Sequence, residues 1–488
     1  MEVEADQSHG LNGKPWYAVG SPWMVALAFS LNSALNAVMC INFSVSTKLT
    51  QDVLRVGEPA VAWMYTTVML TVCLGLPMSF LFVVKFEAAG LWSSVVCNVL
   101  SAWIRWWGVK WSSYSLCLFS VMLNGIAASL FFALPAQLSQ QRFPAKLWVL
   151  TTSLMVQANY SGWMLGCILV PLLVRDASDT ESFMLWQAVA SLGVLAFFAH
   201  FYRPLPREQA SQELQCRQRT AYDCFQDAED VSEESSSTSN QSEDGASAVR
   251  ENGDVTLGGH GPSRPAIAHS VHGPPEAKFE LTEMLALLRM CPSFCCQVLA
   301  YGVMGGVGFA LPGANDAILE THGFSSQDTL WFNVLFIASG VISGLLLGSL
   351  CMRPAGYRRV LLVIFGAGVG ALTGLAVLMS GSHEASGLLH GIFLFLIAVV
   401  GVASIGFLGL GIETAALYPN GGSYGCFLIY LMIQVAGAVL NQVGSTANGF
   451  IVMAAAGWLA LVLLLAGNPR YWREKPAQPG DATIGATC

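Results

Sequence analysis

The chain has 488 residues, of which 54% are hydrophobic and only 11% are charged, and its mean hydropathy is +0.55. Soluble domains carry roughly 25% charged residues, so this composition excludes an ordinary water-soluble enzyme. The net charge of −8 and the lack of a basic stripe in the sequence exclude a nucleic-acid-binding protein. The sequence therefore describes an integral membrane protein.

Twelve apolar runs follow one another along the chain, each about as long as the roughly 20 residues that a transmembrane helix needs. The predicted helices are 22–45, 61–84, 90–109, 114–138, 147–174, 183–201, 292–313, 329–351, 360–380, 387–411, 424–446 and 449–467. The polar stretch before the first run lacks the basic region of a cleaved signal peptide. We therefore expect the first run to be a retained anchor.

Charge is concentrated between the sixth and seventh runs. Residues 202–280 hold 14 of the 31 acidic and 7 of the 23 basic residues, and they include a Ser/Asp/Glu tract without aromatic side chains. Such a segment cannot bury enough apolar surface to offset the entropy lost on ordering, so it is predicted to be a disordered linker. It separates a tail (1–21) and a six-helix bundle (22–201) from a second bundle (281–467) and a second tail (468–488). The linker is either a solvated tether or a binding site for a cytoplasmic kinase or another partner.

Basic residues near the predicted helix ends set the orientation in the membrane. Lys85, Arg142 and Arg358 lie on one side, together with bases of both tails and of the linker, whereas Lys48 and Arg175 lie on the other. This bias predicts that both termini and the linker face the cytoplasm.

Two features inside the apolar runs concern helix packing. Gly340, Gly344 and Gly348 are spaced by four, so they share one helix face and allow another helix to approach closely. Arg105 lies near the end of the third run, where we expect its side chain to extend to the membrane surface.

The arrangement of six plus six helices around a long cytoplasmic loop resembles the major facilitator superfamily. Glu87 and Gly90 match the acid and the glycine of that superfamily's loop between helices two and three, and Arg353 matches a base of the corresponding loop in the second half. The resemblance implies an all-α membrane protein with 12 transmembrane helices in two six-helix bundles, which rock around a central binding site. It implies gating or conformational roles for Glu87, Gly90, Arg353 and Glu413. Glu413 is otherwise a solvated or ion-paired residue at a helix end.

Longer strings occur in one order along the membrane part. They are 29–37 (FSLNSALNA), 98–105 (NVLSAWIR), 134–136 (LPA), 159–166 (NYSGWMLG), 301–304 (YGVM), 411–419 (GIETAALYP), 422–425 (GSYG) and 434–437 (QVAG). Together they resemble the feline leukaemia virus subgroup C receptor family, solute carrier family 49. Members of this family have been linked to choline and ethanolamine, to heme and to vitamin B6 compounds, so the resemblance implies a transporter of a small organic solute.

The resemblance also implies a substrate site. In the choline-transporting members, a Trp on the first helix and a Tyr on the seventh form an aromatic clamp, and Gln residues on the fifth and eleventh helices complete it. This chain has Cys40, Phe309, Tyr160 and Gln434 at the matching positions. Aromatic faces attract a quaternary ammonium through the ring quadrupole, and Trp163 would complete a cage with the other aromatic residues. The predicted substrate-binding residues are Asn36, Cys40, Tyr160, Phe309 and Gln434.

Three functions stay open at this point. The first is secondary transport of a small cationic or zwitterionic solute, the second is transport of heme or another porphyrin, and the third is a non-transporting receptor or scaffold that acts through the linker. The sequence has no Walker loop, no Ser-His-Asp order and no zinc spacing, so we expect neither an enzyme nor ATP drive, metal or cofactor. No Asp, Glu or His is clearly central in a predicted helix, which favours uniport. We expect a monomer in the lipid bilayer of the plasma membrane, with an organellar membrane as the alternative.

Overall fold

The computed structural model describes residues 20–204, 288–289 and 291–467, apart from residues 46, 133 and 325 and the segments 321–323, 352–355, 381–386, 417–420 and 445–447. The residues described form helices and turns and contain no strand. The two predicted tails and the predicted linker lie almost wholly outside the described residues.

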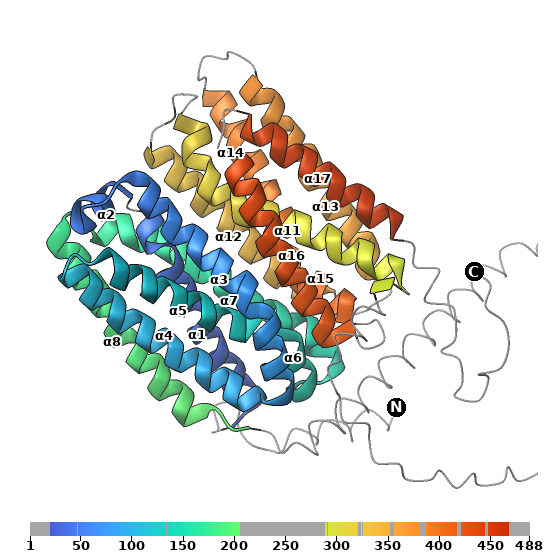
Figure 1. Ribbon diagram of the computed structural model, residues 1–488. Coiled ribbons are helices and arrows are strands. Elements are labelled where there is room, and N and C mark those ends of the chain that lie inside the picture. Colours follow the sequence, from blue (N-terminus) through green and yellow to red (C-terminus); the bar gives the residue numbers. More distant parts are fainter. Residues whose placement is uncertain are drawn as a thin grey trace, which may run out of the picture.

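The first half of the described chain forms a bundle of six long helices, drawn from blue to green in Figure 1. They are α1 (Pro22–Val45), α3 (Glu58–Lys85), α4 (Glu87–Lys110), α5 (Tyr114–Phe132), α7 (Trp148–Leu173) and α8 (Ala177–Phe201). The short helices α2 (Thr47–Leu54) and α6 (Pro135–Arg142) and the 3-10 turn η2 (Ala145–Leu147) lie in the connections. These helices cover the first six predicted runs.

The second half forms a bundle drawn from yellow to red in Figure 1. It consists of α11 (Pro292–Glu320), α12 (Ser326–Leu350), α13 (Tyr357–Ser380), α14 (Gly387–Gly401), α15 (Leu408–Ala416), α16 (Gly421–Gly444) and α17 (Gly449–Ala466). A π-helical turn, η5 (Val402–Gly406), joins α14 to α15, so that these three elements make up the tenth predicted span. The predicted all-α fold of two bundles is confirmed.

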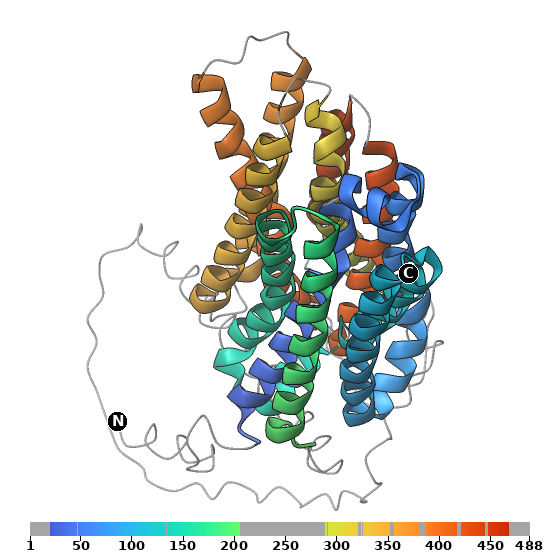
Figure 2. The same cartoon turned by 90° about the vertical axis from the view of Figure 1, so that its left-hand side faces the viewer.

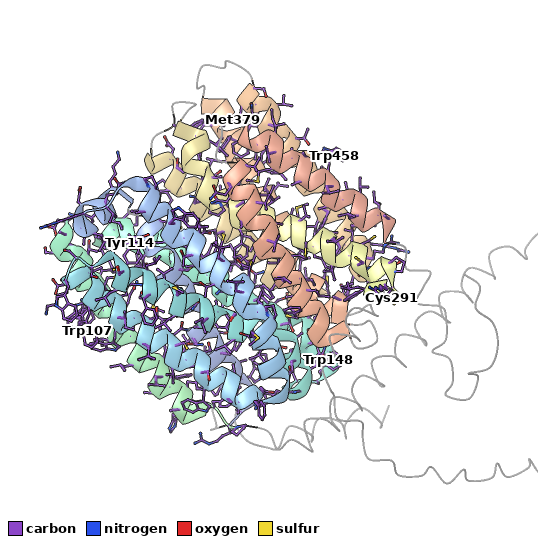
Figure 3. The ribbon with its side chains drawn as sticks, in the orientation of Figure 1. Trp107, Tyr114, Trp148, Cys291, Met379 and Trp458 are labelled. Carbon is purple, nitrogen blue, oxygen red and sulfur yellow. The ribbon has the colours of Figure 1, made fainter. Side chains whose placement is uncertain are left out.

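Large apolar side chains cover the outside of both bundles. Leu74 and Trp186 are exposed by 77% and 72%, and Figure 3 shows Trp107 and Trp458 on the surface. Such a surface suits lipid rather than water. Eleven of the helical stretches described are long and apolar enough to cross a membrane. The twelfth long helix, α4, has 24 residues and is more polar, and it packs between α5 and α8.

The two bundles meet along two pairs of helices, α7 with α12 and α3 with α16. We call the end of the molecule where α1 begins and α8 ends the base; there, the backbone N–H of Gly20 donates to the carbonyl of Phe201 at 3.1 Å. At the base, α6 and α7 of the first bundle also contact α15 and α16 of the second. Figure 1 shows these ends close together, and Figure 2 shows the helices of both bundles running roughly along one axis.

Glycines set the closest helix approaches in the second bundle. At Gly306 of α11, an added Cβ would lie 2.6 Å from the Cβ of Ala436 in α16. The predicted glycine face of α12 is divided between two neighbours: Gly340 faces Ile405 in η5, whereas Gly344 and Gly348 face α7 of the other bundle. The face therefore serves both packing within a bundle and contact between bundles.

Candidate functional site

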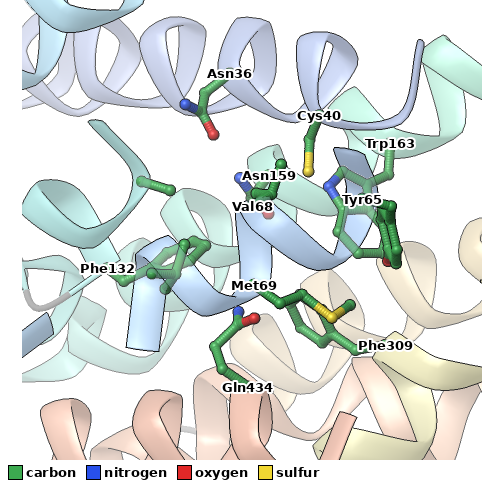
Figure 4. A pocket seen from close by; sticks show the side chains of 12 residues that line it. Asn36, Cys40, Tyr65, Val68, Met69, Phe132, Asn159, Trp163, Phe309 and Gln434 are labelled. Carbon is green, nitrogen blue, oxygen red and sulfur yellow. The ribbon is translucent and has the colours of Figure 1, made fainter. Parts of the chain in front are cut away.

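A cavity lies between the two bundles, about midway along the helices. The space between its lining atoms is about 330 Å³, which includes space that is open to solvent. Helices α1, α3, α5 and α7 line it from one bundle, and α11 and α16 line it from the other. The lining residues are Asn36, Cys40, Tyr65, Val68, Met69, Val72, Ala128, Phe132, Asn159, Trp163, Phe309 and Gln434, and none of them is charged (Figure 4).

Aromatic rings form one wall of the cavity and bridge the bundles. Trp163 of α7 meets Phe309 of α11 edge-on, with ring centroids 4.9 Å apart, and Tyr65 of α3 contacts Trp163 at 6.3 Å. Tyr160 meets both Phe309 and Trp163 edge-on, at 5.8 and 6.2 Å. Ring faces carry partial negative charge, so this wall suits a cationic or apolar group.

Three amide side chains supply the polar groups of the cavity. Asn36 and Asn159 use their NH₂ groups to donate to neighbouring helices, Asn36 to Asn98 Oδ1 at 2.7 Å and Asn159 to Ser33 Oγ at 3.2 Å. Their carbonyl oxygens, and the whole carboxamide of Gln434, have no hydrogen-bond partner among the described residues. In Figure 4 the oxygen of Asn36 points into the cavity, and Gln434 reaches toward it from the other bundle. The cavity therefore offers mainly acceptors to a bound solute.

A ladder of buried polar side chains holds Asn36 in this orientation. Ser94 Oγ accepts from Asn32 at 3.0 Å, Asn32 Oδ1 accepts from Asn98 at 2.7 Å, and Asn98 in turn accepts from Asn36. Asn124 of α5 accepts a further bond from Asn36 at 3.0 Å. Each amide can be turned only one way if all these bonds are to form, so the ladder fixes which end of Asn36 faces the cavity.

Arg105 is buried, which corrects the expectation that it extends to the membrane surface. Its side chain is 1% exposed, and its guanidinium donates to Ser120 Oγ at 3.1 Å and to the carbonyl of Met39. It also lies over the ring of Phe43, 5.2 Å from the centroid. The reason is its place on α4: it continues the polar face of Ser94 and Asn98, which is turned toward α1 and α5.

The structure brings four of the five predicted substrate residues to this cavity. Asn36, Cys40, Phe309 and Gln434 line it, whereas Tyr160 does not and lies behind the ring of Phe309. The contributions of α3 and α5 were not predicted from the sequence, and Asn159 was not among the predicted substrate-binding residues. The α3 residues are apolar or aromatic, so nothing in a single sequence separates them from lipid-facing residues.

Contacts between the bundles close the base beneath the cavity. Thr152 of α7 donates to Glu413 of α15 at 2.5 Å, and the Glu413 side chain is 3% exposed. Phe132, which lines the cavity, stacks on Tyr430 of α16 with centroids 4.6 Å apart, and its carbonyl accepts from Cys426 Sγ at 3.2 Å. Glu413 is therefore an inter-bundle contact in this structure and not a solvated helix end.

A second polar cluster at the base lies within the first bundle. Glu87 at the start of α4 pairs with Arg142 of α6 at 3.4 Å, and the Tyr202 hydroxyl approaches Glu87 at 3.5 Å. Burial, with Glu87 adding to it, raises the pKa of Tyr202 above its ordinary range. Gly90, one turn into α4, is buried. Arg353, the remaining predicted gating residue, lies outside the described residues.

Sequence comparison identifies the family. The profile of the Major Facilitator Superfamily matches residues 23–433. The chain belongs to the Major Facilitator Superfamily. It is thus an integral, multi-pass membrane transporter, and the narrower resemblance to solute carrier family 49 stays a prediction. No curated protein matches the sequence.

Solved structures of the Major Facilitator Superfamily share this fold at low sequence identity. A proton:xylose symporter, XylE, bound to a bromodeoxyglucose is 14% identical, with a TM-score of 0.61 over 91% of this chain and 95% of that one. A human organic anion transporter, TETRAN, is 14% identical, with a TM-score of 0.57 over 92% and 99% of the two chains. The Escherichia coli fucose:proton symporter FucP is 9% identical, with a TM-score of 0.53 over 91% and 97%. These similarities concern the fold alone.

Proposed function

We propose that this superfamily member is a secondary transporter that binds one small organic solute in the cavity between its bundles and carries it by alternating access. One observation carries the proposal: residues of both bundles, Asn36 and Cys40 on one side and Phe309 and Gln434 on the other, face the same small space. Rocking of one bundle against the other would open such a site to each side of the membrane in turn.

The chemistry of the cavity favours a solute with hydrogen-bond donors or a positive charge, such as choline or ethanolamine. The carbonyl oxygens of Asn36 and Asn159 are free to accept, and the rings of Trp163 and Phe309, which meet edge to face, line the same space and would attract a cation. The lining contains no Asp, Glu or His, which supports uniport rather than proton symport. We assign substrate contact to the predicted residues, with Tyr160 supporting the ring of Phe309.

Heme is the second candidate, and the lining of the cavity counts against it, because a porphyrin needs a wide apolar space and the amide side chains of Asn36, Asn159 and Gln434 line this one. A receptor or scaffold that acts through the linker is the third candidate. It would bind a partner there without moving solute across the membrane.

The contacts at the base suggest how the gating residues act. We assign Glu413 to a bond that is made in the closed base and broken when the bundles separate there. We assign Glu87 and Gly90 to the start of α4, where the pair with Arg142 ties α4 to α6. Arg353 keeps its predicted gating role.

A thermal-shift screen of the purified protein against choline, ethanolamine, pyridoxine and heme tests the proposal. A ligand that binds only the folded protein raises its melting temperature. We expect a saturable rise with an amine, and we expect Gln434→Ala to weaken it, since that variant removes a free carboxamide from the cavity. A rise with heme alone would favour the second candidate. An equal rise in the wild type and in Gln434→Ala would contradict the assignment of the cavity.

A further inference from the structure

Gln157 of α7 makes a contact between the bundles directly below the cavity. It lies on the base side of Asn159 and Trp163, and its side chain is 1% exposed. Its Nε2 donates to the backbone carbonyl of Ile405 in the second bundle at 3.1 Å. A side chain of the cavity-lining helix thus reaches the backbone of the opposite bundle.

The second bundle has a socket that admits this side chain. Gly344 of α12 faces the Gln157 carboxamide so closely that an added Cβ would collide with Nε2 and Cδ. One turn toward the base, a Cβ at Gly348 would lie 2.9 Å from the Cβ of Ser153, also in α7. The glycine face of α12 therefore leaves the space that the Gln157 side chain occupies between α7 and α12.

The acceptor, Ile405, lies in the π-helical turn η5 between α14 and α15. Single π turns inside α-helices are frequent at functional sites. Where the helix type changes, a backbone group can lose its usual hydrogen-bond partner. In a membrane, such a group must find another partner within the protein. The Ile405 carbonyl accepts from the backbone N–H of Phe407 and also from Gln157, so one of the two bonds to this group is made only while the bundles are in contact.

The hydrogen bond from Gln157 is strong enough to favour the closed base and weak enough to break when the bundles separate. Only Nε2 is bonded, while Oε1 of Gln157 has no partner among the described residues. One neutral hydrogen bond changes an equilibrium by roughly three- to ten-fold.

We propose that Gln157 is a latch that holds the base closed by bonding η5 through the Gly344 socket. This inference rests on the alternating access of the proposed function. It adds a positioning residue: by tying α7 to η5, Gln157 sets the α7 wall of the cavity, including Asn159 and Trp163, against the second bundle.

Two native cysteines report on the latch without any substrate. Cys426 is 0% exposed and lies at the base between the bundles, bonded to the carbonyl of Phe132. Cys117 is also 0% exposed but lies inside the first bundle, against Gly108. Opening of the base exposes the first thiol and not the second, whereas unfolding exposes both.

The experiment measures labelling of the full-length protein in detergent by N-ethylmaleimide, followed at each cysteine by peptide mass spectrometry. We expect Gln157→Leu to speed labelling of Cys426 by roughly three- to ten-fold and to leave Cys117 unchanged. Gln187→Leu is the matched control. Gln187 is a buried glutamine that accepts from Asn42 at 2.7 Å within the first bundle, so its loss should not move Cys426 relative to Cys117.

A second pair of variants tests the socket. Gly344→Ala should speed labelling of Cys426 in the same way, because the added methyl displaces Gln157. Gly193→Ala should not, since nothing lies within 4 Å of that position. Unchanged Cys426 labelling in both Gln157→Leu and Gly344→Ala would overturn the latch, and so would an equal rise at Cys117 in both. Absence of solute flux with faster Cys426 labelling would refute the proposed function and leave the latch intact.

Discussion

Both bundles bring helices together at glycines, as Gly162 of α7 approaches the Ala34 carbonyl of α1, but the first bundle adds a ladder of buried amides. In the first bundle, α1, α4 and α5 are joined by side-chain hydrogen bonds among Asn32, Asn36, Asn98 and Asn124. In the second, α11 and α16 come together at glycines, as at Gly306. Helix association in lipid has no hydrophobic driving force, so it relies on close packing and on such polar bonds.

The two kinds of helix contact have different effects on the cavity. Hydrogen bonds between amides have direction, and the ladder in the first bundle turns the oxygen of Asn36 toward the cavity. Glycine contacts have no such direction, and they bring α16 close to α11 so that Gln434 and Phe309 line the same space. The ladder of the first bundle thus orients the polar group of Asn36, and close packing in the second bundle places Gln434 and Phe309.

The largest effect should come from breaking the ladder at Asn98. Asn98→Leu leaves the NH₂ of Asn36 and the Oδ1 of Asn32 short of a partner, and buried polar groups without partners cost about 1–3 kcal/mol each. We expect the melting temperature in detergent to fall by more than it does in Asn333→Leu, which removes the Asn315–Asn333 bond of 2.7 Å in the second bundle. Equal losses in the two variants would contradict the contrast between the bundles.

A smaller effect is expected from Gly306→Ala in the second bundle. The added methyl would meet Ala436 of α16 and force the helices apart, and such overpacking costs about 1–3 kcal/mol. Gly370→Ala on α13 is the matched control, since a Cβ added there would meet no neighbouring helix or side chain within 4 Å. Thermal unfolding of both variants measures the difference. A melting temperature for Gly306→Ala as high as for Gly370→Ala would show that close packing does not hold α11 to α16.

The smallest effect concerns the helix ends. Asp176 caps α8 by accepting from Ser178 and Asp179, and the bond from the Ser178 side chain, followed by that from the Asp179 backbone, lowers the pKa of Asp176. A carboxyl with a lowered pKa stabilises the folded state above its ordinary pKa, and this contribution is lost as the pH falls through the lowered value. Asp176→Ala should therefore lower the melting temperature at neutral pH and progressively less below about pH 3.8.

Asn448→Ala is the corresponding helix-end variant in the second bundle. Asn448 precedes α17 but makes no side-chain capping bond, so its replacement should change little at any pH. A pH-independent effect of Asp176→Ala would contradict the role of its carboxylate as the cap.

The sequence predicts the twelve helices well because each is a long apolar run, and run length is a local property. It does not predict η5, because this turn lies inside one such run. Only its contacts with α7 and α12 distinguish its position. It also misplaces Arg105, because the side to which an arginine turns depends on the neighbours of α4 and not on the distance from the helix end.

The candidate site is predictable where a polar residue or a family motif marks it, as at Asn36 and Gln434. It is not predictable on α3. Val68 and Met69 line the cavity, but in the sequence they cannot be distinguished from residues that face lipid. Trp163 was expected to complete an aromatic cage, and it does meet Phe309 across the bundles. Its partner Tyr65 carries no signal in the sequence, because the contact between them depends on how α3 and α7 pack.

Solute flux is the most direct test of the central claim, which is that the cavity between the bundles carries a small solute across the membrane. The measurement is uptake of radiolabelled choline and ethanolamine into proteoliposomes without ATP or an imposed proton gradient. The account predicts saturable uptake of at least one amine by the wild type, and much weaker uptake by Gln434→Ala at equal protein content. Uptake no greater than in protein-free liposomes, or equal uptake by Gln434→Ala, would contradict it.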